Sequence, residues 1–242
     1  MRLSLYFLAV LLLVSGCATP SIAQRSRALE GSGTPGSRTE DARGVHDVSL
    51  SVPGTLVIEV GRDAPLRIEG DANIVGALVI DRDGNELEIR APRRTNLRPN
   101  RPLRLRMGVA SLESVSVAGR GQIEAAGISA DDFDASVAGS GTIILGGLDA
   151  RTVAVSIAGS GAITIDGQAE ELDLSIAGSG DADVEDLAVY EADISIAGSG
   201  NAFVNVSELL SASIVGSGDV RYHGNPDIRR SVMGSGDIEP IR

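Results

Sequence analysis

The sequence predicts an all-β fold: a single-stranded parallel β-helix of about seven coils, capped by an N-terminal region of β-strands. The motif SIAGSG, or a close variant, occurs seven times. Its copies begin every 18 to 20 residues, at Ser116, Ser136, Ser156, Ser175, Ser195, Ser213 and Ser231. Apolar and polar residues alternate on both sides of each copy, and no copy carries a helical period of 3.6 residues. Together these observations predict one structural unit that is stacked repeatedly on itself.

Each repeat is predicted to form one coil of the β-helix. Around the fourth copy, Leu172, Leu174 and Ile176 alternate with polar or small residues, and the same phase continues after the glycines. This alternation is typical of strands with one buried face. Each repeat is interpreted as a strand, GSG, a second strand, a turn and a short return segment. Glycines lie near the predicted turn in three copies, at Gly127, Gly147 and Gly167.

Two columns of apolar residues are predicted to face the core, one residue per coil, with about 4.8 Å between coils. The first contains Val117, Val137, Ile157, Ile176, Ile196, Ile214 and Val232. The second contains Ile123, Ile143, Ile163, Ala182, Ala202, Val220 and Ile238. In this phase both glycines of GSG face inward at a bend, while the serines and the alanine face outward. The motif is therefore interpreted as a corner rather than a catalytic loop.

The first 24 residues are typical of a lipoprotein signal peptide. Arg2 precedes an apolar run over 3–14 that is too short to span a bilayer. The run ends in VSGC, which resembles the lipobox of bacterial lipoproteins, so we predict lipid attachment at Cys17, the only cysteine. Ala18 favours the outer over the inner membrane. The alternative is cleavage after Ala23, which would give a free periplasmic or secreted protein.

Residues 25–44 are rich in Gly, Ser, Arg and Pro and predict a flexible linker. The domain is expected over 45–242, with N-terminal cap strands over 45–110 and repeated coils over 111–242. Strands are predicted at 48–52, 55–60, 65–69, 76–81 and 86–90, with a hairpin at Asp83-Gly84. The cap strands are expected to pair locally. A formal charge of −12 argues against nucleic acid as a partner.

The order of segments resembles the head GIN domain family of bacterial adhesin-like proteins. A GDANI segment over 70–74 is followed by DGNELEIR over 83–90, the repeated SIAGSG coils and a final YHGNPDIRRSVMGSGDI over 222–238. The resemblance covers about residues 45–242. It implies a right-handed parallel β-helix in the cell envelope. It supplies no established functional residues.

Several polar clusters could carry chemistry, and each also has a structural interpretation. Asp219 and Asp237 are expected on adjacent coils, either as a solvated edge or sharing a cation. The acidic run over 181–186 fails the calcium-binding nonapeptide pattern. His46 and His223 lie too far apart in sequence to suggest a site. The basic residues Arg90, Arg93, Arg94, Arg98, Arg101, Arg104 and Arg106 could bind phosphates or anionic glycans, or could lie on a loop and strand.

The repeats, without any single-copy catalytic constellation, predict a non-enzymatic envelope lipoprotein that presents a repetitive surface to a partner. No catalytic, metal or cofactor residue is predicted. The expected partners are the membrane, through the lipid, and an unidentified surface or polymer. One alternative is a polysaccharide-active enzyme, which a groove with paired acids and bound oligosaccharide would favour, although the chain has no tryptophan to stack on sugars. Another is an assembly role through end-on pairing, which Pro240 hinders.

Overall fold

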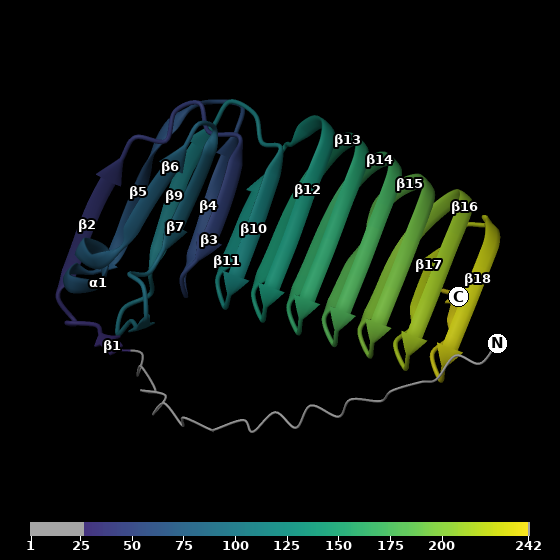
Figure 1. Ribbon diagram of the computed structural model, residues 1–242. Helices are drawn as coiled ribbons and strands as arrows, with labels where there is room; N and C mark the ends of the chain where they lie inside the picture. The colour runs from purple at the N-terminus through teal and green to yellow at the C-terminus, as the bar shows by residue number, and fades with distance from the viewer. Residues whose placement is uncertain (1–26, 242) are drawn as a thin grey trace, which may run out of the picture.

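The structure is a computed structural model and describes residues 27–241. Its body is a β-solenoid in which each turn of the chain lies on the turn before it (Figure 1). The predicted parallel β-helix is therefore confirmed, and the seven corner motifs bound six complete turns. Its strands are β10 (Ser114–Gly119), β11 (Gln122–Ala126), β12 (Ser129–Gly139), β13 (Thr142–Gly159), β14 (Ala162–Gly178), β15 (Asp181–Gly198), β16 (Asn201–Gly216), β17 (Val220–His223), β18 (Asp227–Gly234) and β19 (Ile238–Pro240).

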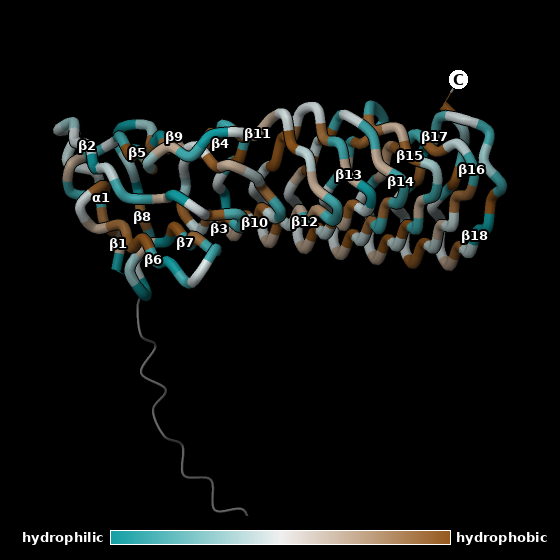
Figure 2. The backbone as a smooth tube through the Cα atoms, turned by 90° about the horizontal axis from the view of Figure 1, so that it is seen from above, coloured by the Kyte–Doolittle hydropathy of each residue, from teal (hydrophilic) through white to brown (hydrophobic). Residues whose placement is uncertain are grey.

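Each turn has two flat sides with the core between them. Strand β13, for example, begins at Thr142 just after one GSG corner, bends at Gly147, where φ is +62°, and ends at Gly159 in the next corner. The strands of successive turns pair in parallel register on both sides. Figure 2 shows the two sides as opposite rows, with β3, β7, β10 and β12 in one and β4, β9 and β11 in the other.

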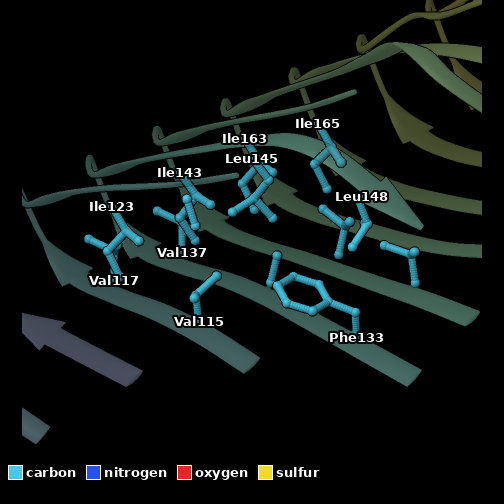
Figure 3. Packing of buried hydrophobic residues seen from close by; sticks show 14 of the residues in the cluster. Val115, Val117, Ile123, Phe133, Val137, Ile143, Leu145, Leu148, Ile163 and Ile165 are labelled. Atoms are coloured by element: carbon cyan, nitrogen blue, oxygen red, sulfur yellow. The ribbon is translucent and has the colours of Figure 1, made fainter. Parts of the chain in front are cut away.

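The core is built from the two predicted columns. Residues of the first column pair in register from Val117 to Ile214 and are at most 2 % exposed; those of the second, from Ile123 to Val220, are 0 % exposed. Figure 3 shows part of both columns, with Val117 and Val137 in one and Ile123, Ile143 and Ile163 in the other. The exceptions are the last member of each column: Val232 is 39 % exposed and Ile238 is partly buried, because no further described turn covers them.

The N-terminal region adds two more turns to the solenoid, in an order that the sequence does not follow. Strands β3 (Asp47–Ser51) and β4 (Thr55–Val60) pair with β10 and β11 on one side. On their other side lie β7 (Glu86–Arg90) and β9 (Arg104–Val109). After β4 the chain therefore builds the outer turn with β7 and β9, and only then passes to the opposite side of β3 and β4 at β10. The expected local pairing is wrong for these strands.

Antiparallel strands close the N-terminal end of the rod. Strand β5 (Ala64–Asp71) pairs with β9 and with β2 (Pro35–Glu40). Strand β6 (Val79–Asp83) pairs with β7 in a hairpin at Gly84, as predicted. The short helix α1 (Ala72–Ala77) replaces the first residues of the strand predicted at 76–81. Figure 1 shows these elements grouped at the end opposite β18.

The linker predicted over 25–44 is wrong for its described part. Strand β1 (Arg27–Glu30) pairs in parallel with β8 (Thr95–Arg98), and β2 pairs with β5. Backbone hydrogen bonds hold these strands, so they do not need an apolar pattern. The carboxylate of Asp71, only 1 % exposed, also accepts backbone N–H bonds from Gly33 at 2.7 Å, Asn100 at 2.8 Å and Arg101 at 2.9 Å.

Candidate functional site

The GSG corners form a backbone ladder along one edge of the rod. At each step, the N–H of the corner serine donates to the carbonyl of the first glycine in the previous corner; Ser179 donates to Gly159 at 2.8 Å. The first glycine has positive φ in every corner, +130° at Gly178. The second is buried, as at Gly180. The motif is structural, as predicted, but only its second glycine faces inward. The first, Gly178, is half-buried, and a Cβ atom there would meet the backbone of the turn below, so its predicted inward position is wrong.

The acidic column after the corners is part of the same architecture. The Asn201 N–H donates to Asp181 Oδ1 at 3.1 Å, and the Asp219 N–H donates to Asn201 Oδ1 at 3.3 Å. The Asp237 N–H then donates to Asp219 Oδ1 at 3.0 Å. The side chains of Asp181, Asn201 and Asp219 thus each accept a hydrogen bond from the backbone of the next turn, and the Asp219 carboxylate is engaged by the Asp237 N–H.

The acidic run over 181–186 does not gather into a metal centre. Asp181 belongs to the ladder, and Glu185 lies 3.8 Å from the His223 ring. Among residues 27–241, no group of three or more His, Cys, Asp or Glu side chains could hold a metal ion.

His46 lies beside a serine and a glutamate, but not in the arrangement of a catalytic triad. Its Nδ1 is 2.9 Å from Ser111 Oγ and 3.4 Å from Glu113 Oε1. A triad requires the serine and the acid on different ring nitrogens, so that one proton can pass through the ring. Here both partners compete for one nitrogen, which excludes that mechanism.

The arginines over 90–106 fall into two groups: some form ion pairs with carboxylates, and others are exposed on strand β9. Arg90 is ion-paired with Asp81 and Glu88, each at 3.1 Å, and Arg98 is paired with Glu30 at 3.2 Å. Arg104 and Arg106 lie on the exposed side of β9, where they alternate with buried residues as predicted for a strand.

A column of serines marks the outer face of the long side. Ser116, Ser136, Ser156, Ser175, Ser195, Ser213 and Ser231 pair in register. Their small side chains leave an open hollow of about 460 Å³ along this face. This is the repetitive surface that the sequence predicts.

A second candidate site is a groove at the return bend, which we call the return-corner groove. It has a volume of about 530 Å³ and crosses five successive turns. One row of its lining side chains is Ser129, Asp149, Gln168, Ala188 and Asn205, which pair in register. Two residues further along each turn, the second row is Asp131, Arg151, Glu170, Tyr190 and Ser207. Four spacings of about 4.8 Å give it a length of about 19 Å.

The groove is hollow because its floor consists of small residues. Ala130, Ala150 and Ala169 lie between the two rows, followed by Val189. The alanine methyl groups are too small to fill the space between the two rows of polar side chains, so a groove remains between the rows. Gln168 Nε2 donates to Asp149 Oδ1 at 3.1 Å, and Arg151 is ion-paired with Asp132. Tyr190 is 57 % exposed and offers an aromatic ring to a ligand.

The chemistry of the groove suits binding more than bond cleavage. Its carboxylates, on Asp131, Asp149 and Glu170, are all exposed, and one of them already accepts an amide hydrogen bond. Three carboxylates against one guanidinium give the lining a negative charge, which disfavours anionic ligands. No residue type recurs along the first row of this groove, because Ser129, Asp149, Gln168, Ala188 and Asn205 differ from turn to turn.

Comparison with known proteins places the fold in a family. The family described as "Putative auto-transporter adhesin, head GIN domain" matches residues 46–226. The chain belongs to this family. The match ends before β18, and the groove lies wholly within the matched part of this head GIN domain.

Solved structures share the fold of this GIN-family chain. A "putative adhesin" from Bacteroides fragilis has 22% identity and a TM-score of 0.82, and the alignment covers 88% of this chain and all of that one. A "putative lipid binding protein" from Parabacteroides distasonis has 24% identity and a TM-score of 0.72, covering 89% and 100%. A "putative adhesin" from Parabacteroides merdae has 20% identity and a TM-score of 0.68, with the same coverage. No curated protein matches the sequence.

The predicted lipid site, Cys17, lies outside the described residues. Within the described part of the chain, no helix is long and apolar enough to cross a bilayer.

Proposed function

We propose that this protein is a non-enzymatic binding module of the bacterial cell envelope, which holds an extended polymer in the return-corner groove. The observation that carries the proposal is the groove itself: two polar rows and an exposed Tyr190 follow five turns over a floor of small residues. An extended chain could contact each turn in the same way. Many weak contacts of this kind give affinity without a deep pocket.

Membership in an adhesin-like family supports a place at the surface or in the envelope. We propose a lipid on Cys17 as the anchor and the outer membrane as its location, because the VSGC segment with Ala18 after it fits that pathway. A rod attached at one end would hold the groove away from the membrane.

The negative lining of the groove narrows the choice of ligand. It favours an uncharged or cationic polymer, such as a neutral glycan or a peptide, over phosphorylated or acidic ones. Tyr190 would stack on a sugar ring or on an apolar side chain, since tyrosine combines a large apolar face with a polar end.

The test is co-sedimentation of the full chain with insoluble envelope polymers and neutral polysaccharides, followed by titration of those that bind. We expect Tyr190→Ala to weaken binding by at least about fivefold, as loss of a central aromatic contact does. Ile144→Ala is the matched control, because Ile144 is 40% exposed but lies outside the groove. Equal affinities for both variants would contradict the proposal.

The carboxylates of Asp131, Asp149 and Glu170 in the groove favour one alternative function, that of a polysaccharide-active enzyme. Glycoside hydrolysis needs two carboxyl groups at a set separation across the bond that is cleaved. If incubation with a bound polysaccharide releases new reducing ends, and Asp149→Asn stops the release while binding persists, the enzyme function replaces the binding module.

A further inference from the structure

Three arginines form an exposed patch on the N-terminal part of the rod. Arg67 lies on β5, and Arg104 and Arg106 lie on β9. We call these residues the arginine patch. All three are exposed on the outward side of adjacent strands. The residues that alternate with them are buried in the core: Leu66, Ile68, Leu105 and Met107.

The pairing of the two strands places like charges together. Arg67 stands directly opposite Arg106 in the antiparallel β5–β9 register, and Arg104 follows two residues away on the same face. Side chains directly opposite each other on neighbouring strands have Cβ atoms about 5 Å apart, and like charges there are unfavourable. An anion between the guanidinium groups would turn this repulsion into attraction.

Nearby acids reduce the positive charge of the patch but do not form ion pairs with it. Glu69 is opposite Arg104 in the register, and Glu59 lies on the adjacent strand β4. Even so, none of the three arginines forms an ion pair with a carboxylate among residues 27–241, whereas Arg38, Arg90 and Arg98 of the same region all do. The guanidinium groups of the patch are therefore available to a ligand.

We propose that the arginine patch binds the phosphate groups of anionic lipid headgroups at a membrane surface. Guanidinium groups match phosphate oxygens in two-pronged hydrogen bonds. The patch spreads over an open sheet face, so it fits an array of phosphates better than one enclosed anion. It also lies at the end of the rod where the described chain begins, with β2 and β5 (Figure 1). Because the chain has a net charge of −12, the arginine patch would be attracted to an anionic surface while the acidic parts of the rod are repelled by it.

The inference depends on neither the groove nor the lipid. It concerns different residues, and it can be tested in a chain whose Cys17 has been replaced. The effect should fall steeply with salt, because interactions of exposed charges are screened over about 10 Å at 0.1 M ionic strength.

The experiment measures vesicle binding by the full chain carrying Cys17→Ser. Vesicles of phosphatidylcholine alone are compared with vesicles that also contain phosphatidylglycerol. We expect preferential binding to the anionic vesicles, weakened on the order of 100-fold by the triple change Arg67→Gln, Arg104→Gln and Arg106→Gln. The matched control, Arg120→Gln with Arg221→Gln and Arg229→Gln, removes the same charge elsewhere and should keep most of the binding.

Thermal melting separates binding from folding. The patch variant should melt at the wild-type temperature or above it, since the change removes a repulsion and no ion pair. Equal vesicle affinity of the patch and control variants would overturn the proposal, as would a lack of preference for anionic vesicles. Binding of inorganic phosphate to the chain without vesicles, more tightly than the anionic vesicles bind, would point to a free-phosphate site and overturn the membrane assignment.

Discussion

The two glycines of each GSG corner are required for different reasons. At Gly178 φ is +130°, and a Cβ atom would overlap the carbonyl oxygen of Gly159 in the turn below. At Gly180 φ is not in the left-handed region, but a Cβ atom would lie 2.5 Å from Ile157 Cγ2 in the core and 2.6 Å from the carbonyl oxygen of Gly161 in the turn below. Both glycines therefore allow the turns to stack; the first also supplies the positive φ, and the second also allows the core to close. Ser179 between them is exposed and contributes its backbone N–H.

Gly178→Val should destabilise the fold strongly, because a branched side chain meets both a disfavoured φ and the backbone of the turn below. We expect a loss of more than about 2 kcal/mol in the free energy of unfolding. Ser179→Val keeps the N–H bond and should change it by no more than about 0.5 kcal/mol. Urea melts measure both. Equal midpoints, or a lower midpoint for Ser179→Val, would mean that the corner is not built as described.

Asp71 fastens the first strands to the cap. Burial alone would raise the pKa of its carboxyl, but backbone N–H donors from Arg101, Gly33 and Asn100 outweigh that effect and hold the pKa below its ordinary value. Because the folded-state pKa is lowered, the carboxylate contributes fully to the stability of the fold when the pH is above the unfolded-state pKa of about 3.9. That contribution is lost as the pH falls through the lower folded-state pKa. Its contribution is therefore complete at neutral pH.

Asp71→Asn should loosen this attachment at neutral pH. An amide has one oxygen, so its NH₂ group must face the N–H of Gly33 or those of Asn100 and Arg101. Hydrogen exchange followed by mass spectrometry should show faster exchange over 27–40, with the repeated coils unchanged. Asp83→Asn, in the exposed hairpin, is the control. Unchanged exchange over 27–40 would show that strand pairing alone holds these residues.

At the scale of the elements, the two ends of the solenoid differ. Antiparallel strands close the N-terminal end, whereas β18 pairs only with β16 among the described residues and is exposed along its length. Arg230 occupies an inward position there, in register with the buried Ala212. An inward-pointing charge is one way in which an edge strand resists pairing with another chain.

Arg230→Val should therefore promote end-on association. The change completes an apolar end with Ile228 and Val232, which are already 41 % and 39 % exposed. Arg229→Val removes the same charge from the outward side and serves as the control. Sedimentation velocity should show concentration-dependent dimers for Arg230→Val only. If both variants remain monomeric, Arg230 does not protect this edge.

The elements differ in how far their positions could be predicted from the sequence. Alternation fixes which side chains face inward, so the columns through Ile157 and Ile163 could be predicted from residue types alone. Strands β1 and β2 could not, because backbone pairing and the Asp71 carboxylate hold them rather than an apolar pattern. The return-corner groove could not be predicted either. Ala130, Ala150 and Ala169 recur with the 20- and 19-residue spacing of the corners, but this spacing does not show that the bend above them is hollow.

At the scale of the whole molecule, the proposed lipid decides where the rod is held. Cys17→Ser should move the protein from the membrane fraction to the soluble periplasmic or secreted fraction. A palmitate analogue supplied to growing cells should label the wild type alone. An unlabelled wild type whose mature chain begins at Gln24 would contradict the anchor and favour ordinary signal cleavage after Ala23.

The central claim is that a polymer lies along the rod and contacts successive turns. Alanine substitutions along one row of the groove, at Ser129, Asp149, Gln168 and Asn205, test it most directly when the affinity for a bound polymer is measured for each. The account predicts graded losses of about 2- to 12-fold in every variant, as expected for single hydrogen bonds in equivalent places. Affinities unchanged in all four, or a loss confined to one position, would contradict it.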